Sequence, residues 1–229
     1  MKSVIIYEDK DILIIHKPSG IATQTAKLGQ ADVESELKNY LKQTGQNTYL
    51  AVVHRLDQPV EGLLVFAKTP QAAAKLSKDL QNGSLKKYYH ALVPLYPALE
   101  QKQGHLTDNL LKDGRTNLSK VVSTNDKNAK KAELDWKLCG QYAYNGAEYA
   151  LVEIELFTGR HHQIRVQMSH AQMPLLGDNK YASQDSARLS EMAGIRHTAL
   201  LASKIRLKHP VSGKILEYTL PFPEEWKIK

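Results

Sequence analysis

The chain of 229 residues has few of the residue types and runs that define several common protein classes. Its one cysteine, Cys139, excludes an internal disulfide framework and is typical of a reducing compartment, so we expect a cytoplasmic protein. No apolar run approaches the ~20 residues that a membrane helix requires, and acidic residues come too early for a signal peptide. A phosphate loop of the Gly-x-x-x-x-Gly-Lys-Ser/Thr type is also missing, which argues against ATP-driven chemistry.

Positive charge is in moderate excess, with 31 Lys and Arg against 24 Asp and Glu and a net charge of +7. Lys and Arg make most protein contacts to phosphate groups, so this balance agrees with RNA as a partner. The signal is mild, because many basic proteins bind no nucleic acid. The length fits one domain with a sizeable core, and we expect a monomer.

Apolar periodicity predicts more strands than helices. The expected strands cover residues 4–7, 12–15, 63–67, 85–93, 132–138, 149–157, 199–207 and 216–220, and the expected helices cover 31–43, 70–82 and 162–171. Several strands follow one another in hairpin order, which predicts an α/β (α+β) fold with a mixed, largely antiparallel sheet. Residues 97–131 are polar and predict a basic surface insertion that lacks enough apolar residues for a core of its own.

A short polar loop in the segment 51–68 holds the first candidate catalytic group. Two apolar runs with strand character bracket this loop, which carries His54, Arg55 and Asp57. A carboxylate beside cations at the rim of a sheet suits chemistry more than packing. The alternative is an aspartate that caps a turn, which is the usual role of a loop Asp.

Residues 157–166 read Phe-Thr-Gly-Arg-His-His-Gln-Ile-Arg-Val and form the second candidate. A strand ends there and a helix begins among basic side chains, where free N–H groups favour a phosphate. The alternative is that Arg160 and Arg165 are solvated while the histidines pack or cap. A metal site is rejected, because the adjacent His161 and His162 cannot both face one ion and His170 is too far along the helix.

The strand around residues 87–93 contributes the third candidate, Tyr89. An aromatic face can stack on a base that has been pulled out of its helix. A tyrosine packed in the core is the alternative.

These segments, taken in order along the chain, resemble the signature of the RluA-type pseudouridine synthases, which isomerise uridine in RNA. Residues 54–68 match the central motif, residues 87–91 match Lys-x-Tyr-x-Ala, and residues 159–166 match Gly-Arg-x-His-Gln-Ile/Leu-Arg-Val. Residues 14–20 and 174–181 match the Lys-Pro-x-Gly and Pro-x-x-Gly-Asp-x-x-Tyr elements. Two departures stand out: Gln167 replaces the usual His, and Gln-Pro-Val-Glu follows Asp57 where many relatives have a Thr or Ser pair.

The resemblance implies the pseudouridine synthase fold, with flanking helices and two lobes around a central cleft in a single catalytic domain over residues 1–229. It implies Asp57 as the catalytic residue, paired with an arginine that keeps it ionised. The substrate-binding residues implied by the same motifs are Tyr89, Arg165, Arg55, Ile164 and Arg160. The isomerisation needs no redox change, so neither a cofactor nor a metal is expected.

Relatives often carry an additional S4-type RNA-binding domain, which we do not expect here because the first hairpin begins at Val4. Target choice then rests on the catalytic domain and on a basic arm within residues 97–131, with a solvated loop as the equal alternative. The basic residues of this arm are Lys112, Arg115, Lys120, Lys127, Lys130 and Lys131. Ribosomal and transfer RNA are both plausible substrates.

Two other functions are alternatives to the RNA isomerase. One is a catalytically silent RNA-binding or assembly factor on the same fold, which the intact Asp57, Tyr89 and Arg165 argue against. The other is a glycosidase acting on a free nucleoside, which would need two carboxylates where the motifs supply one.

Overall fold

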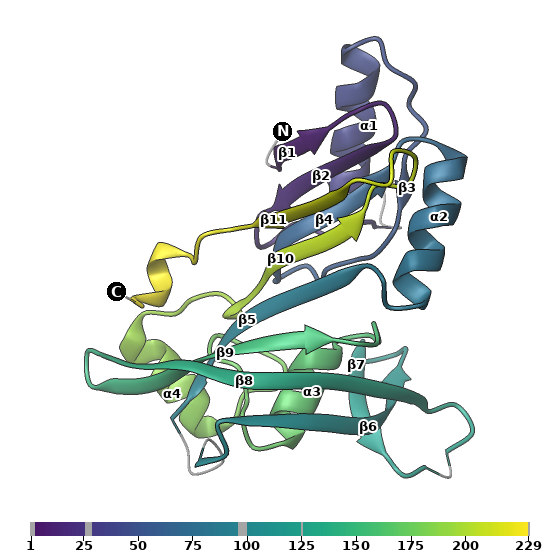
Figure 1. The fold of residues 1–229 in the computed structure, drawn as a ribbon. Helices are drawn as coiled ribbons and strands as arrows, with labels where there is room; N and C mark the ends of the chain where they lie inside the picture. The colour runs from purple at the N-terminus through teal and green to yellow at the C-terminus, as the bar shows by residue number, and fades with distance from the viewer. Residues whose placement is uncertain (1–2, 26–28, 96–99, 125, 229) are drawn as a thin grey trace. The chain divides into compact units, whose positions relative to one another are not determined.

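The computed structural model describes residues 3–25, 29–95, 100–124 and 126–228, and these fall into two compact units. The first unit comprises Met1–Lys87 and Ala202–Pro221, and the second comprises Tyr88–Leu201 and Phe222–Lys229. Figure 1 shows the elements of each. The described residues contain no helix that is long and apolar enough to cross a membrane.

The first unit is built on a sheet with the strand order β1-β2-β4-β10. β3 pairs with β4 at one side and β11 pairs with β10. The strands are β1 (Val4–Glu8), β2 (Ile12–Lys17), β3 (Ala51–Val52), β4 (Glu61–Ala67), β10 (Leu200–Lys208) and β11 (Ile215–Thr219). The four residues Ile12–Ile15 of β2 are fully buried and form the centre of this core. The predicted first hairpin is confirmed, because β1 and β2 pair antiparallel.

Two helices of the first unit flank its sheet, and both begin where the sequence provides a cap (Figure 1). α1 (Val33–Gln43) starts after Asp32, whose side chain accepts a hydrogen bond from Ser35 N–H. α2 (Pro70–Gln81) starts after Thr69, which caps the N–H of Ala72. A capping oxygen and a first-turn proline satisfy or remove the free N–H groups of a helix start. Both predicted helices are confirmed.

The second unit is an antiparallel sheet in the order β5-β9-β8-β6-β7. Its strands are β5 (Lys86–Pro94), β6 (Gln103–Asp113), β7 (Leu118–Val122), β8 (Lys130–Tyr144) and β9 (Ala147–Leu156). The helical elements are α3 (Gln163–His170), α4 (Gln184–Ala193) and the 3-10 turn η2 (Glu224–Trp226). α3 packs on one face of the sheet, where Val166 joins Leu110 and Ala132 in a buried cluster.

The stretch 97–131, predicted to be a basic surface insertion, contains strands that the sequence analysis did not expect. Residues 96–99 and 125 lie outside the described residues, but most of the rest forms β6, β7 and the start of β8. Leu110 of β6 is 4% exposed and packs against α3, while many of its neighbours are polar and exposed. An alternating strand needs only every second residue to be apolar, so a polar composition does not exclude it. The mixed, largely antiparallel fold class itself is confirmed.

Candidate active site

Asp57 lies on the loop between β3 and β4, and this loop is bound to the segment that follows β2. The hydroxyl of Thr23 accepts a hydrogen bond from Leu56 N–H (3.1 Å) and donates one to Leu56 O (3.0 Å). On the other side of Asp57, the N–H of Gly20 donates to Gln58 O (2.9 Å). The backbone is therefore fixed immediately before and after Asp57, which is what the positioning of a reacting carboxylate requires.

Lys17, the last residue of β2, strengthens this attachment. Its side chain is fully buried, and its ammonium donates to three carbonyl oxygens, those of Pro18 (3.0 Å), Ile21 (2.8 Å) and Gln58 (3.2 Å). Burial lowers the pKa of Lys17 to about 8, and the nearby carboxylate of Asp57 acts in the opposite direction. One ammonium thus ties the start of the Lys-Pro-x-Gly segment to the residue after Asp57.

Two motif glycines are required because the backbone comes close to a neighbouring segment. Gly62, at the start of β4, has φ +136°, and a Cβ there would lie 2.5 Å from the backbone N of Ala202 on β10. Gly177 has φ +67°, and a Cβ there would overlap the carbonyl of His197. Only glycine tolerates both conditions, so these positions keep the Asp57 loop and the Asp178 turn in place.

His54 is a neutral imidazole within the Asp57 loop. Its Nε2 accepts a long hydrogen bond from Val65 N–H (3.4 Å), so the ring proton belongs on Nδ1. This Nδ1 is buried and has no hydrogen-bond partner among the residues that the structure describes. Burial, and then the charge of Lys87, lower the pKa of His54 to about 3.

Arg165 lies on α3 in the second unit and is 1% exposed. Its Nε and Nη2 donate to the two carboxylate oxygens of Asp178, each at 2.6 Å. Asp178 is itself oriented, because its Oδ1 also accepts the N–H groups of Lys180 (2.9 Å) and Tyr181 (3.2 Å). A buried, bidentate ion pair of this kind fixes the plane and direction of a guanidinium.

Tyr181 connects Arg165 to a pair of histidines. Its ring centroid lies 5.2 Å from Arg165 Cζ, within the range of a cation–π contact. Its hydroxyl accepts from Ser119 N–H (2.8 Å) and shares a hydrogen bond with His162 Nδ1 (2.8 Å). The rings of His162 and His161 stack with their centroids 3.7 Å apart. The pKa of His162 is lowered to about 3, mainly by burial and then by the charge of Arg165. His162 is thus held as a neutral, hydrogen-bonded ring.

Two glutamines attach α3 to the sheet. Gln163 accepts from Thr158 Oγ1 (2.7 Å) and donates to Glu133 O (3.1 Å). Gln167, which replaces the usual His of the motif, is fully buried and donates to the carboxylate of Asp108 (2.9 Å). The departure at position 167 therefore keeps a polar link between the helix and β6.

The other predicted substrate-binding residues differ in exposure. Tyr89 is 5% exposed on β5 and pairs with Ile154 of β9, on the sheet face that α3 covers. Ile164 is buried on α3, whereas Arg160 is exposed and donates to Lys131 O (2.8 Å). Arg55 is exposed beside Asp57.

Three of the predicted site residues therefore belong to the second unit, namely Tyr89, Ile164 and Arg165, and Asp57 belongs to the first. The pairing of Asp57 with Arg165 stays a prediction. Sequence reasoning gave no role to Lys17, Asp178 or Tyr181, although all three stand in the two short elements that it quoted. The signal that could have found them is that these two short elements accompany the main motifs in the family signature.

One group of possible metal ligands occurs among the described residues, formed by Asp9, Asp11 and His209. Hydrogen bonds within this group explain why these side chains lie close together. Nδ1 of His209 accepts from Ser212 N–H (3.0 Å), so Nε2 carries the proton and donates to Asp9 (2.7 Å). Asp9 also accepts from the hydroxyl of Tyr7 and the N–H of Asp11, both at 2.8 Å. This set ties the β1–β2 turn to the end of β10.

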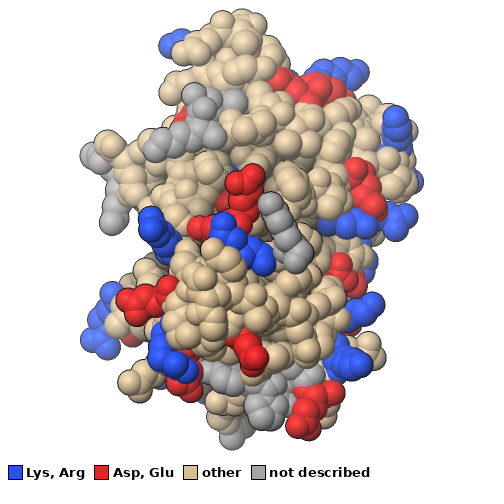
Figure 2. Space-filling model, turned by 90° about the vertical axis from the view of Figure 1, so that its left-hand side faces the viewer, with Lys and Arg blue, Asp and Glu red and all other residues tan. Residues whose placement is uncertain are grey.

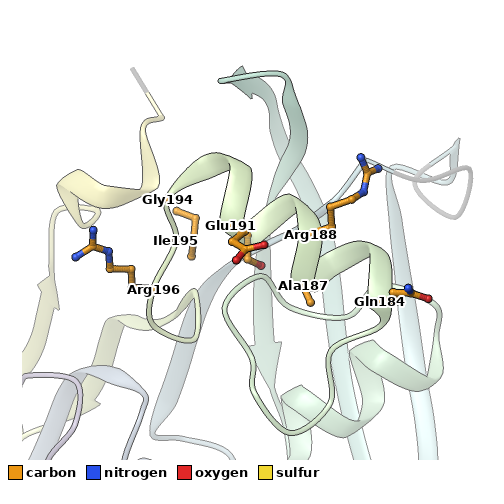
Figure 3. Close-up of a pocket in the computed structure, with 8 residues that line it drawn as sticks. Gln184, Ala187, Arg188, Glu191, Gly194, Ile195 and Arg196 are labelled. Atoms are coloured by element: carbon orange, nitrogen blue, oxygen red, sulfur yellow. The ribbon is translucent and has the colours of Figure 1, made fainter.

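A pocket of about 810 Å³ runs along α4 in the second unit (Figure 3). None of the motif residues lines it. The guanidinium groups of Arg188 and Arg196 extend in opposite directions in Figure 3, with Glu191 between them. The polar groups do not converge on one point, as a ligand site would require, so we assign this pocket no role.

Comparison with solved structures identifies the fold. The chain superimposes on human RNA Pseudouridylate Synthase Domain Containing 1 with a TM-score of 0.77, 20% identity and coverage of 96% of this chain and 84% of the other. For human RNA Pseudouridylate Synthase Domain Containing 4 the TM-score is 0.74, with 22% identity and coverage of 96% and 88%. The fold is therefore that of the pseudouridine synthases, as predicted.

Sequence comparison shows the family. Residues 11–170 match the model of the RNA pseudouridylate synthase family. The chain is 29% identical to a tRNA pseudouridine synthase C of Yersinia pestis, over 97% of this chain and 88% of that protein. It is 33% identical to a ribosomal large subunit pseudouridine synthase C of Buchnera aphidicola, over 97% and 68%. The chain belongs to the RNA pseudouridylate synthase family, so the predicted family and the predicted class, an isomerase acting on RNA, are confirmed.

Proposed function

We propose that this protein converts uridine to pseudouridine in structured RNA, with Asp57 as the catalytic residue. The observation that carries the proposal is the loop of Asp57, which lies within the family match and is fixed before and after the carboxylate by Thr23 and Gly20. A solvated turn aspartate needs no such attachment. The neighbouring Arg55 is exposed and available to RNA.

The reaction breaks the N1–C1′ bond of uridine, turns the uracil and joins its C5 to C1′. Cleavage of such a bond develops positive charge on the sugar, and an ionised carboxylate near C1′ stabilises it. Asp57 either attacks C1′ and is later displaced by C5, or removes a sugar proton as a base. In both routes the C5 proton is finally lost and no group is gained, so we propose that the enzyme needs neither cofactor nor metal.

Arg165 is assigned the task of keeping Asp57 ionised. A carboxylate in a closed pocket stays charged only when a cation or several donors face it. Asp178 engages Nε and Nη2 of Arg165, and Nη1 is the nitrogen that we assign to Asp57. A guanidinium has donors on two edges, so it can bridge the two carboxylates.

A uridine inside a helix cannot be reached, so it must leave the stack, which costs about a few kcal/mol. Arg55 fills the vacated space in the RNA helix, and Tyr89 stacks on the extruded uracil. Ile164 and Arg160 are assigned to the same substrate site, Ile164 as an apolar wall and Arg160 as a phosphate contact.

The proposed substrate is ribosomal or transfer RNA, on which the named relatives act. Basic and acidic side chains are interspersed on the face in Figure 2, so we assign RNA binding to local groups on β6, β7 and β8. We place the enzyme in the cytoplasm as a monomer. The single cysteine, Cys139, suits a reducing compartment.

The basic arm can be tested with a matched pair of variants. Lys112 and Lys130 share the sheet face of Leu110, which α3 covers, whereas Lys120 and Lys131 lie on the opposite face. All four lysines are exposed. Neutralising either pair is expected to weaken RNA binding and flatten its salt dependence, because all four lysines belong to the basic arm. An unchanged affinity and salt slope for both pairs would remove the arm from the proposal.

The proposal is tested by incubating the protein with transcripts labelled in uridine and analysing the digested nucleosides. Wild-type protein is expected to yield pseudouridine, and Asp57→Asn to yield none at unchanged thermal stability. Free uracil would indicate a glycosidase, and tight binding without any product would indicate a silent RNA-binding factor. Mapping pseudouridines in cells with and without the protein then identifies the RNA.

A further inference from the structure

The turn that carries Asp57 lies just beyond the paired part of β2 and β4. These strands pair antiparallel, and their register ends at Lys17 and Gly62. Asp57 O accepts a hydrogen bond from Val60 N–H at 3.0 Å, which closes a turn over residues 57–60. Contacts other than the β2–β4 ladder must therefore attach this turn to the segment that follows β2.

Side chains from both segments make part of this attachment. Nε2 of Gln58 donates to Gly20 O (2.9 Å), and Oγ of Ser19 donates to Pro59 O (2.8 Å). Gln58 and Pro59 belong to the stretch Gln-Pro-Val-Glu, in which the chain departs from the common family pattern. The departing residues thus have partners of their own within the first unit.

Glu61, the last residue of this stretch, pairs with His16 of β2. Nε2 of His16 lies 2.7 Å from Oε1 of Glu61. A carboxylate only accepts hydrogen bonds, so Nε2 carries the proton and donates it. Both side chains are half-buried, so solvent screens this pair less than a pair on the open surface. The pair spans the two strands at the point where the turn enters β4.

We propose that His16 and Glu61 are positioning residues for Asp57, because they hold the end of its turn on β2. The inference rests on the proposed function, which makes Asp57 the catalytic residue. The bond from Val60 N–H to Asp57 O connects the two ends of the turn, so a displacement at Glu61 also moves Asp57. Small displacements of a reacting carboxylate lower the rate of chemistry more than they lower substrate binding.

The first test measures the single-turnover rate of pseudouridine formation. Glu61→Ala is expected to lower this rate about tenfold at unchanged RNA affinity, because the turn loses its attachment at one end. Glu61→Gln keeps an oxygen that accepts from His16, so it is expected to recover most of the rate. RNA affinity is measured separately in the Asp57→Asn background, in which nothing turns over.

Glu217→Ala is the matched control. Glu217 of β11 pairs with Lys204 of β10 at 2.9 Å, so this variant also breaks a cross-strand ion pair in the sheet of the first unit. It is expected to leave the rate unchanged and to shift the melting temperature as much as Glu61→Ala does. If Glu61→Ala and Glu217→Ala form pseudouridine equally fast, the pair does not position Asp57.

The double variant tests whether His16 and Glu61 act together. His16→Ala is expected to lower the rate as much as Glu61→Ala, and the double variant no further, because either single change already breaks the pair. A loss of about a hundredfold in the double variant would mean two independent roles and would overturn the proposal. Weaker RNA binding at an unchanged rate would also overturn it, because the pair would then contact RNA.

Amide hydrogen exchange at Val60 tests the same attachment without any activity. The Val60 N–H closes the turn, so its exchange is expected to be about tenfold faster in Glu61→Ala than in wild type and unchanged in Glu217→Ala. Equal exchange in all three proteins would overturn the proposal. If wild-type protein forms no pseudouridine, the proposed function fails, and the exchange rates still decide whether this pair holds the turn.

Discussion

The Asp57 loop of the first unit and the Arg165 site of the second are built in different ways. Asp57 is positioned through its backbone, which Thr23, Gly20 and Lys17 hold by hydrogen bonds to carbonyl and N–H groups. Arg165 is positioned through its side chain, by a bidentate ion pair with Asp178. The first arrangement acts on the backbone on either side of the carboxylate, whereas the second engages part of the charged group itself.

The two neutral histidines repeat this contrast. His162, beside Arg165, has its Nδ1 in a hydrogen bond with the hydroxyl of Tyr181. His54, beside Asp57, has a buried Nδ1 without a partner in the described residues. Among the described residues, the buried ring nitrogen beside Arg165 thus has a hydrogen-bond partner, while the one in the Asp57 loop has none.

The largest expected effect is that of Asp178→Asn. It leaves the buried guanidinium of Arg165 without its counter-charge, which is expected to lower the free energy of unfolding by about 3–5 kcal/mol and abolish activity. Urea denaturation measures the change. Asp185→Asn, an exposed carboxylate in the first turn of α4, is the control and should cost only a few tenths of a kcal/mol. Equal stability of the two variants would contradict the ion pair as the organiser of the second unit.

Lys17→Met probes the other region and is expected to change catalysis more than stability. Three carbonyl oxygens lose their donor, but the cost of burying an ammonium disappears as well. A loosened Asp57 loop is expected to lower kcat by about tenfold to a hundredfold at unchanged RNA affinity. Single-turnover kinetics measure kcat, with Lys42→Met, a change at an exposed lysine of α1, as the control. If Lys17→Met has the same kcat as wild-type protein, the backbone contacts of Lys17 do not position Asp57.

A smaller effect is expected for Tyr181→Phe. It removes the hydroxyl that joins Ser119 N–H to His162 Nδ1 and leaves both groups unsatisfied, at a cost of about 1–3 kcal/mol in stability. Tyr144→Phe removes an exposed hydroxyl and should be neutral. If both variants unfold at the same urea concentration, the Tyr181 bridge does not stabilise the Arg165 site.

The last effect, the acid sensitivity that neutral His54 confers, is confined to acidic pH and is absent at neutral pH. The pKa of His54 is about 3 in the folded chain and about 6.5 in the unfolded chain, so between these pH values only the unfolded chain binds the proton. The stability tied to neutral His54 is complete above pH 6.5 and is lost as the pH falls towards 3. The unfolding free energy of His54→Phe should therefore depend less on pH in this window than that of wild type. Parallel pH curves for the two proteins would contradict a neutral His54.

The sequence predicted elements whose signals are local. The starts of α1 and α2 are predicted by the capping residues Asp32 and Thr69 and by Pro70 in the first turn. The β1–β2 hairpin is predicted by two apolar runs on either side of a polar turn. The family motifs singled out Asp57 and Arg165. Such features are determined by residues close together in the chain, so they can be predicted from a single sequence.

The elements that the sequence did not predict bury polar or small residues. α4 was missed because its buried positions are Ser186, Ser190 and Ala193, which give no apolar stripe. β6 and β7 were missed because packing on α3 rests mainly on Leu110 and Val121. The roles of Lys17 and Asp178 depend on partners that folding brings together, and no local pattern reveals them.

The most direct test is the distance between the Asp57 carboxylate and the Arg165 guanidinium in a crystal structure of the protein. We predict a hydrogen-bonded pair at about 3 Å, with the uracil of a bound stem-loop beside it. Carboxylate and guanidinium groups more than about 8 Å apart and facing different surfaces would contradict the proposed mechanism, because solvent would then screen the charge that must keep Asp57 ionised.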